Sequence, residues 1–204
     1  MSLGDLIRRN TAWIFGGNIS EHVFLFIVGV ILARILVPED FGLLVTIQIF
    51  TGTLGFIAGG GMGEALVQAK AVDEKDFKVV FTAQLAICIL IYAGLFFASP
   101  FFSEWFNDPR YTDLLRVSGL TFILRPFLNI PRAIMRREMQ FKKITIIRLV
   151  ALAIGSLSSI FMALEGLGTW ALVFGGFVGS LCSLSLLLYT TKWIPGLAYR
   201  KKTL

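Results

Sequence analysis

The sequence predicts an all-α, polytopic membrane protein with six transmembrane helices, and three observations support this prediction. Of the 204 residues, 56% are hydrophobic and 16% are charged, whereas soluble domains average about a quarter charged residues. The mean hydropathy is +0.78. The apolar residues gather into long runs, and about 20 residues are enough to cross a hydrocarbon core. With one histidine and two cysteines, a zinc module and a disulfide scaffold are excluded.

Six apolar runs of about 20 to 26 residues define the predicted helices. They lie at residues 11–36, 41–66, 79–102, 111–135, 144–164 and 169–190. Residues 3–9 are expected to form a separate short helix on the membrane surface, because two arginines follow three apolar side chains there. The whole chain, residues 1–204, is therefore predicted to be a single transmembrane lobe.

The distribution of basic residues predicts the orientation. Loops rich in Lys and Arg remain on the cytoplasmic side of a membrane. Both termini are therefore predicted to be cytoplasmic, and no nucleic-acid partner is expected despite the net charge of +6. Fourteen of the 19 basic residues fall on one predicted side: Arg8, Arg9, Lys70, Lys75, Lys78, Arg132, Arg136, Arg137, Lys142, Lys143, Lys192, Arg200, Lys201 and Lys202.

The first predicted helix carries a polar face formed by Asn18, Glu21 and His22. Charged side chains inside a membrane are costly and often mark ion or proton pathways. One interpretation is a proton-linked site, because Glu and His can exchange a proton when their neighbours tune them. The other is a structural pair that bonds to a neighbouring helix. The sequence leaves both open.

The second predicted helix ends in the triplet Gly59, Gly60 and Gly61. Its small residues form a stripe at helical spacing, made of Gly52, Gly55, Gly59 and Gly63. Small residues allow another backbone to approach closely, so helix packing is the default explanation. A glycine triplet also permits local unwinding, and the sharper hypothesis is a hinge or a broken helix at this point.

The fourth predicted helix has the strongest signal for a binding site. Five polar residues lie at offsets that form one narrow stripe on a helix. A guanidinium at this depth needs an anion or a group of carbonyls, and Arg binds phosphate through two hydrogen bonds. The stripe therefore predicts a cationic cavity wall, and the alternative is an internal pair of Arg125 with Glu21. Its members are Ser118, Thr121, Arg125, Asn129 and Arg132.

The last two predicted helices carry weaker signals. Arg148 could join the same cavity, but snorkelling of its side chain to the cytoplasmic interface is favoured. Gly175 and Gly179 repeat the small-residue pattern of the second helix. No set of residues suited to catalysis occurs, so the protein is not expected to be an enzyme, and no metal or other cofactor is expected.

Four segments resemble bacterial oligosaccharide flippases, the polysaccharide-biosynthesis transporters of the multidrug/oligosaccharidyl-lipid/polysaccharide exporter superfamily. They are residues 33–43 (ARILVPEDFGL), 63–68 (GEALVQ), 131–141 (PRAIMRREMQF) and 166–172 (GLGTWAL). The resemblance runs from about Ile7 to Lys202 and identifies the family better than its cargo.

The resemblance implies two six-helix lobes around a cavity that opens alternately to either side of the bacterial inner membrane. It implies transfer of polyprenyl-diphosphate-linked oligosaccharide to the periplasmic leaflet, for synthesis of O-antigen, capsule or exopolysaccharide. The chain is then expected to be the N-terminal lobe, with a second lobe supplied by the same longer chain or by a dimer mate. Membrane lipid and a polysaccharide polymerase are further expected partners.

Residues and resemblance together predict a mechanism. The substrate-binding candidates are Arg125, Asn129, Arg132 and Asn18, with Arg125 attracting the diphosphate of the lipid carrier. Glu21 and His22 are the proton-coupling candidates, and the glycine-rich second helix would help the lobes to rock.

Two rival functions stay open. A multidrug-type cation antiporter would share the architecture but should place unpaired acids in the lobe. A membrane scaffold without transport activity would bind a polysaccharide-assembly enzyme through its glycine-rich faces.

Overall fold

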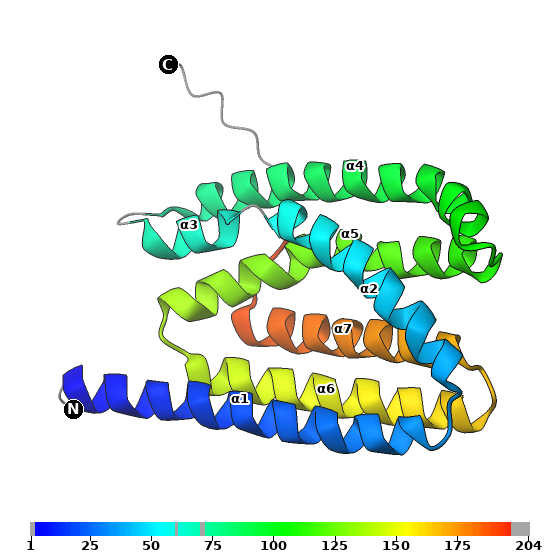
Figure 1. The fold of residues 1–204 in the computed structure, drawn as a ribbon. Helices are drawn as coiled ribbons and strands as arrows, with labels where there is room; N and C mark the ends of the chain where they lie inside the picture. Colours follow the sequence, from blue (N-terminus) through cyan, green and yellow to red (C-terminus); the bar gives the residue numbers. More distant parts are fainter. Residues whose placement is uncertain (1–2, 60, 70–71, 197–204) are drawn as a thin grey trace. The chain divides into compact units, whose positions relative to one another are not determined.

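The computed structural model of the chain describes residues 3–59, 61–69 and 72–196. These ranges are helical and contain no strand, so the predicted all-α class is confirmed for them. In chain order the helices are α1 (Leu3–Ala33), α2 (Pro38–Gly59), α3 (Met62–Gln68), α4 (Glu74–Phe106), α5 (Arg110–Arg137), α6 (Phe141–Leu164) and α7 (Thr169–Thr191) (Figure 1).

Five helical segments of the described chain are long and apolar enough to cross a membrane. α5 is not among them, because its 28 residues include six arginines and one aspartate, and charges count heavily against membrane insertion. The sixth span therefore stays a prediction. The five segments are Trp13–Ala33, Pro38–Gln68, Glu74–Phe106, Phe141–Leu164 and Thr169–Thr191.

Several helix bounds differ by a few residues from those predicted, and two differences change the elements themselves. The helix expected at 41–66 is interrupted: α2 ends at Gly59, Gly61 takes a left-handed conformation with φ 66°, and α3 begins at Met62. Glycine adopts this conformation without the steric cost that a Cβ imposes. Gly60, the middle of the predicted triplet, lies outside the described residues. The surface helix expected at 3–9 is not separate, because α1 runs without a break from Leu3.

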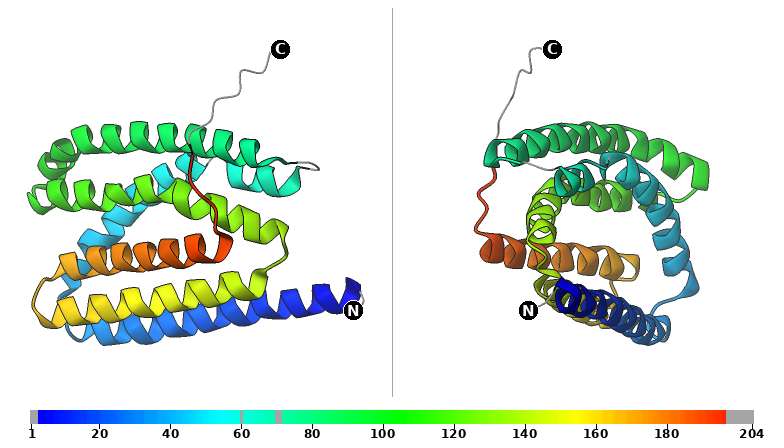
Figure 2. Two further views of the ribbon diagram at one scale, coloured as in Figure 1. Left: turned by 180° about the vertical axis from the view of Figure 1, so that it is seen from behind. Right: turned by 90° about the vertical axis from the view of Figure 1, so that its left-hand side faces the viewer.

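The chain divides into two compact units. Unit 1 comprises Met1–Leu44 and Met135–Leu187. Within it, α1 and α6 lie side by side (Figures 1 and 2). Its apolar core includes Val28, Leu32 and Ala163.

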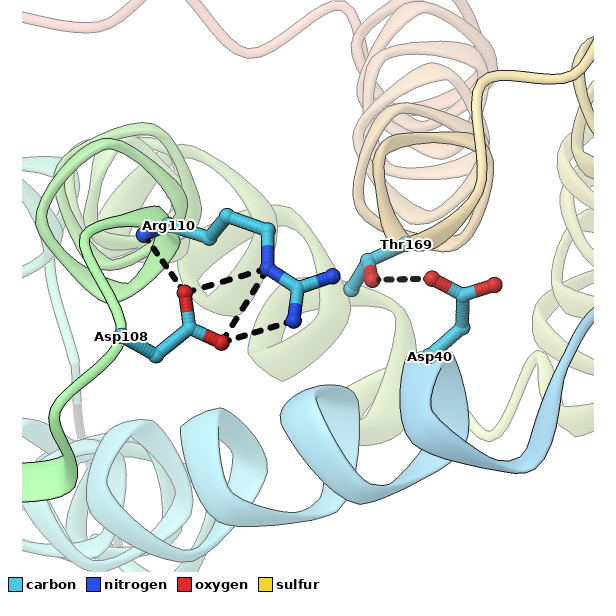
Figure 3. Close-up of polar contacts among 4 residues, drawn as sticks. All are labelled: Asp40, Asp108, Arg110 and Thr169. Carbon is cyan, nitrogen blue, oxygen red and sulfur yellow. Dashed lines mark hydrogen bonds and ion pairs between the residues drawn. The ribbon is translucent and has the colours of Figure 1, made fainter.

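Two contacts fix α7 in unit 1. A Cβ atom at Gly155 of α6 would lie 2.8 Å from the Gly175 carbonyl oxygen of α7, so only small residues allow these two backbones to meet. At the start of α7, the Thr169 hydroxyl donates a hydrogen bond of 2.7 Å to the Asp40 carboxylate (Figure 3).

Unit 2 comprises Val45–Ile134 and Leu188–Leu204. α5 returns along α4, and the Phe81 and Phe127 rings of the two helices meet edge to face at 4.9 Å. The indole of Trp193, which follows α7, lies 5.3 Å from the Phe81 ring. Leu66 of α3 and Ile130 of α5 complete this buried cluster.

The turn between α4 and α5 is closed by an ion pair. Arg110 donates hydrogen bonds to Asp108 from its backbone N–H and from its guanidinium, the shortest being 2.8 Å (Figure 3). Side-chain hydrogen bonding from Arg110 holds the pKa of the Asp108 carboxyl below its ordinary value. The first N–H group of α5 is thereby satisfied, as a helix start requires.

Large apolar side chains are exposed on both units. Phe26 of unit 1 is 72% exposed, and Phe56 and Phe97 of unit 2 are 87% and 80% exposed. Soluble monomers rarely expose apolar surface on this scale. Such faces fit a hydrocarbon environment and agree with the predicted membrane location.

Candidate functional site

Arg125 lies near the middle of α5 and contacts α2 within unit 2. Its Nη1 donates a hydrogen bond of 3.0 Å to the carbonyl oxygen of Gly55. Its guanidinium carbon lies 5.2 Å from the centre of the Phe122 ring. Gly55 is buried, and a Cβ atom there would overlap the guanidinium. The guanidinium of Arg125 can therefore occupy this position because residue 55 has no side chain.

This contact lies one turn before the end of α2 at Gly59. The carbonyl end of a helix carries partial negative charge and attracts cations. Arg125 thus compensates the end of α2 close to the interruption at Gly61. The sequence predicted Arg125 and the glycine triplet as two separate features, and the structure places the guanidinium one turn from the triplet.

The remaining polar stripe follows the predicted face of α5. Ser118, Thr121, Asn129 and Arg132 are half-buried, as is Arg125 itself. The Thr121 hydroxyl donates a hydrogen bond of 2.7 Å to the Ser118 carbonyl oxygen, so this hydroxyl is satisfied within its own helix. The fully buried positions of α5 between them are occupied by Phe122, Pro126, Ile130 and Pro131.

A second polar cluster joins α1 and α6 in unit 1. Nη2 of Arg148 donates a hydrogen bond of 2.8 Å to Oδ1 of Asn18. Nε of Arg148 lies 3.0 Å from Oε2 of Glu21, as an ion pair. Arg148, for which snorkelling to the membrane surface stays a prediction, contacts the polar face of α1. This ion pair agrees with the structural interpretation of that face, in which Glu21 pairs with a residue of a neighbouring helix.

The ion pair of Arg148 is imperfectly aligned. Its buried Nε has no acceptor in hydrogen-bond geometry, although Glu21 Oε2 is 3.0 Å away. The two facts are compatible, because an ion pair depends on distance while a hydrogen bond also depends on angle. The guanidinium is therefore held by charge and by Asn18 rather than by a two-point carboxylate bond.

His22 is placed differently from Glu21. Its Nδ1 lies 2.7 Å from the carbonyl oxygen of Asn18, one turn earlier on α1, and its side chain is exposed. Within the described chain no hydrogen bond or ion pair joins His22 to Glu21. Within their own units, Arg125 bonds to Gly55 and Glu21 pairs with Arg148.

Glycines also allow close contact in both units. A Cβ atom at Gly17 would overlap the Thr145 side chain but lie 3.4 Å from Nη2 of Arg148, an ordinary contact, whereas one at Gly55 would overlap the guanidinium of Arg125. Each unit therefore holds an arginine in a position that depends on a residue of a different helix.

Arg116 is a third arginine whose contacts lie between two of the described helices. Nε of Arg116 donates a hydrogen bond of 3.0 Å to the hydroxyl of Ser99, a fully buried residue. The Ser99 hydroxyl in turn donates a hydrogen bond of 2.8 Å to the Phe96 carbonyl oxygen. The guanidinium carbon also lies 4.3 Å from the centre of the Phe96 ring. Arg116 thus ties α5 to α4. Sequence reasoning assigned it no role, because it lies off the polar stripe.

An apolar groove of about 490 Å³ runs between α2 and α4 within unit 2. Thr53 contributes the polar side chain of the groove's lining. The Thr53 hydroxyl donates a hydrogen bond of 2.8 Å to the Ile49 carbonyl oxygen. The groove therefore offers hydrocarbon surface and no group that would recognise a sugar or a phosphate. Its lining residues are Ile49, Phe50, Thr53, Leu54, Ile91, Gly94, Leu95, Ala98 and Phe102.

No candidate metal-binding site occurs in the part of the chain that the structure describes. There, no three His, Cys, Asp or Glu side chains gather in a group that could hold a metal ion.

Comparison with known proteins gives a consistent result. Residues 31–204 match the family described as "Polysaccharide biosynthesis protein". The chain is similar to the succinoglycan biosynthesis transport protein ExoT of Rhizobium meliloti (strain 1021), with 30% identity over 190 residues, which is 93% of this chain and 38% of ExoT. No solved structure matches the chain.

Two further relatives are more distant. An uncharacterized membrane protein in the cps region of Klebsiella pneumoniae is 26% identical over 69% of this chain and 29% of its own length. The lipopolysaccharide biosynthesis protein WzxC of Escherichia coli (strain K12) is 24% identical over 61% of this chain and 25% of its own length. The chain thus spans 38% or less of the length of these relatives.

Proposed function

Because the chain belongs to the family of polysaccharide biosynthesis proteins, we propose that it is the N-terminal lobe of a flippase. The cargo is a polyprenyl-diphosphate-linked oligosaccharide that crosses the bacterial inner membrane for the synthesis of cell-surface polysaccharide. The names of ExoT, a succinoglycan transport protein, and WzxC, a lipopolysaccharide biosynthesis protein, support this proposal. The partial coverage of both relatives supports the assignment as one lobe.

The proposed lobe has six spans. α5 is the sixth, in addition to the five apolar segments, and both termini are cytoplasmic. A second lobe, from the same longer chain or from a dimer mate, would complete the cavity. A polysaccharide polymerase remains a candidate partner.

Arg125 carries the proposal. Its contacts in the described chain are a carbonyl oxygen and an aromatic ring, so neither is a carboxylate. Its position, 15 residues into a helix of 28, places it far from both helix ends. A guanidinium without a counter-charge at that depth attracts an anion strongly. The diphosphate of a lipid carrier is such an anion, whereas the sugars and the prenyl chain are not.

Two neighbours on the stripe would extend the site. Asn129 and Arg132 follow Arg125 by four and seven residues, which is about 6 and 10 Å along a helix axis. An amide and a second guanidinium on this face can bind the outer phosphate or the first sugar. Asn18, on the polar face of α1, is the remaining substrate-binding candidate. The interruption at Gly59–Gly61 would act as the hinge when the lobes rock.

The rival functions fit the observed contacts less well. A cation antiporter needs an unpaired acid, but Glu21 pairs with Arg148. A scaffold that docks through glycine faces needs those faces uncovered, but Gly175 and Gly179 of α7 contact α6. The glycine contacts therefore favour a role in packing the lobe itself.

The test replaces Arg125 in the protein as its cells produce it. Arg125→Gln is expected to reduce surface polysaccharide at least tenfold and to leave lipid-linked glycan in the cytoplasmic leaflet. Arg125→Lys, which keeps the charge but not the two-point geometry, should retain part of the activity. Arg110→Gln is the matched control, because it removes an arginine from the exposed end of the same helix. Normal export by Arg125→Gln at wild-type protein levels would refute the cationic role.

A further inference from the structure

The apolar groove between α2 and α4 of unit 2 has no part in the proposed function so far. Its volume of about 490 Å³ falls in the range of about 300 to 1,000 Å³ that is usual for ligand pockets. Leu95 of its lining is 4% exposed, whereas Ile49 of its lining is 60% exposed. The groove is therefore buried on one side and open at the surface of the unit on the other.

The two ends of the groove differ in charge. At one end, the rings of Phe50 and Phe102 meet edge to face at 4.5 Å. Toward the other end the lining continues along α2 to Leu54, and the next residue, Gly55, accepts the hydrogen bond from Arg125. Helix carbonyls point toward the C-terminal end of their helix, so the guanidinium lies beyond Leu54. The apolar groove thus leads to a cation.

α5 packs against the groove and also carries this cation. A Cβ atom at Gly119 of α5 would lie 3.0 Å from Cδ2 of Leu95, so the backbone of α5 lies close behind the groove's lining. One turn later, the ring centre of Phe122 lies 5.2 Å from the guanidinium carbon of Arg125. The groove and the guanidinium are therefore held together by the packing of three helices within one unit.

We propose that the groove binds the isoprenoid chain of the lipid carrier while Arg125 binds the diphosphate at the end of that chain. This inference rests on the proposed function and deepens it. A hydrocarbon chain fits the apolar lining. Its anionic end would neutralise a guanidinium whose contacts in the described chain are a carbonyl oxygen and an aromatic ring. A prenyl diphosphate carries its charge directly on the end of the chain, so one molecule fills both sites.

Charge, rather than apolar surface, selects this occupant. A chain that moves from the bilayer into the groove gains little from the hydrophobic effect, because lipid chains are as apolar as the side chains that line the groove. A phospholipid acyl chain could also lie there, but its phosphate stays in the headgroup region at the membrane surface. Arg125 lies near the middle of the proposed span α5. A phospholipid would therefore leave the guanidinium without an anion.

The experiment measures binding of three probes to the full-length natural protein in phosphatidylcholine nanodiscs, with binding to protein-free nanodiscs subtracted. The probes are geranylgeranyl diphosphate, inorganic pyrophosphate and geranylgeraniol, which represent the whole ligand, its head and its chain. The wild type should bind geranylgeranyl diphosphate at least about tenfold more tightly than either part, because joining two contacts in one molecule makes the second contact intramolecular.

A matched pair of glycine variants tests the groove. Gly94 lines the groove, and a Cβ atom there meets open space, so Gly94→Leu should fill the groove without a clash. Its affinity for geranylgeranyl diphosphate should fall nearly to its affinity for pyrophosphate, which should stay at the wild-type value and thereby report a folded protein. Gly52 also has open space at its Cβ but lies outside the lining. Gly52→Leu should therefore bind all three probes as the wild type does.

Three results would overturn the inference. The first is wild-type affinity for geranylgeranyl diphosphate in Gly94→Leu, and the second is an equal loss in Gly52→Leu. The third is competition by a phospholipid: phosphatidylglycerol added to the nanodiscs would lower the affinity of the wild type to that of Gly94→Leu, which would assign the groove to an acyl chain.

Arg125→Gln separates this inference from the proposed function. It should weaken the binding of both diphosphates and leave that of geranylgeraniol unchanged. If Arg125→Gln abolishes binding of both diphosphates while Gly94→Leu behaves as wild type, the inference fails and the flippase proposal stands. If the wild type binds neither diphosphate, both fail.

Discussion

The Asp40 carboxylate accepts a 2.7 Å hydrogen bond from the hydroxyl of Thr169, which joins the start of α2 to the start of α7 within unit 1. Both residues are buried, at 7% and 4% exposure. The preceding Gly168 is left-handed, with φ 54°, and a Cβ there would lie 3.0 Å from the carboxylate. Two of the segments that resemble flippases, 33–43 and 166–172, therefore meet at one hydrogen bond.

Removing this donor should destabilise the protein. In Thr169→Val the buried carboxylate loses its partner while the volume stays nearly constant, and a hydrogen bond to a charged group is worth about 1.5 to 3 kcal/mol. Unfolding of the purified protein in detergent should report a loss of that size. Thr169→Ser keeps the hydroxyl and is the control. Equal stability of the valine and serine variants would contradict the assigned role.

A substitution on α2 should move Arg125 without removing its charge. Gly55→Ala places a methyl group where the guanidinium lies, whereas Gly52→Ala, one turn earlier, meets open space. Alanine improves helix propensity equally at both positions, by about 1 kcal/mol. In an export assay we expect Gly55→Ala to resemble Arg125→Gln and Gly52→Ala to resemble the wild type. Identical export by both would mean that the place of Arg125 over α2 is dispensable.

The crossing of α6 and α7 offers a similar matched pair. A Cβ at Gly175 would overlap the Ser159 hydroxyl and lie 2.8 Å from the Gly155 carbonyl oxygen, while one at Gly176 has nothing within 4 Å. Gly175→Ala should lower the free energy of unfolding by about 1 to 3 kcal/mol through overpacking. Gly176→Ala should be neutral or stabilising by up to about 1 kcal/mol. The test compares the melting temperatures of the two variants, and equal values would contradict the prediction.

The turn before α5 should respond to acid. Hydrogen bonding from Arg110 lowers the pKa of Asp108 in the folded protein. The ionised carboxylate therefore contributes stability above its unfolded pKa, and this contribution is lost as the pH falls through the folded pKa. The difference in melting temperature between wild type and Asp108→Asn should stay constant from neutral pH to about pH 5 and should narrow below about pH 4. A difference that does not narrow below about pH 4 would mean that the charge of Asp108 adds nothing to the fold.

The sequence predicted the elements better than their contacts. Hydropathy located the helices, and helical spacing identified the stripe around Arg125, because both signals are local. The partner of Arg125 is 70 residues away and that of Arg148 is 130 residues away. Such contacts depend on which helix faces which, and a single hydropathy pattern does not contain that information.

The glycines show the same limit. The sequence singled out Gly59–Gly61 for local unwinding, and the left-handed Gly61 lies between α2 and α3. It grouped Gly52 and Gly55 in one stripe, yet only Gly55 of these two meets another residue. Spacing alone does not distinguish a glycine that faces a neighbour from one that faces open space.

The charges of α5 bear on how the chain enters the membrane during synthesis. An arginine near the centre of an inserting helix costs about 2.5 to 3.5 kcal/mol, so the proposed span α5 would be poorly retained by itself. The acceptors of hydrogen bonds from Arg125 and Arg116 are the Gly55 carbonyl of α2 and the Ser99 hydroxyl of α4. Both precede α5 in the chain, so the ribosome delivers the acceptors before the donors. Insertion of α5 is then expected to depend on its upstream neighbours, in the order in which the gene encodes them.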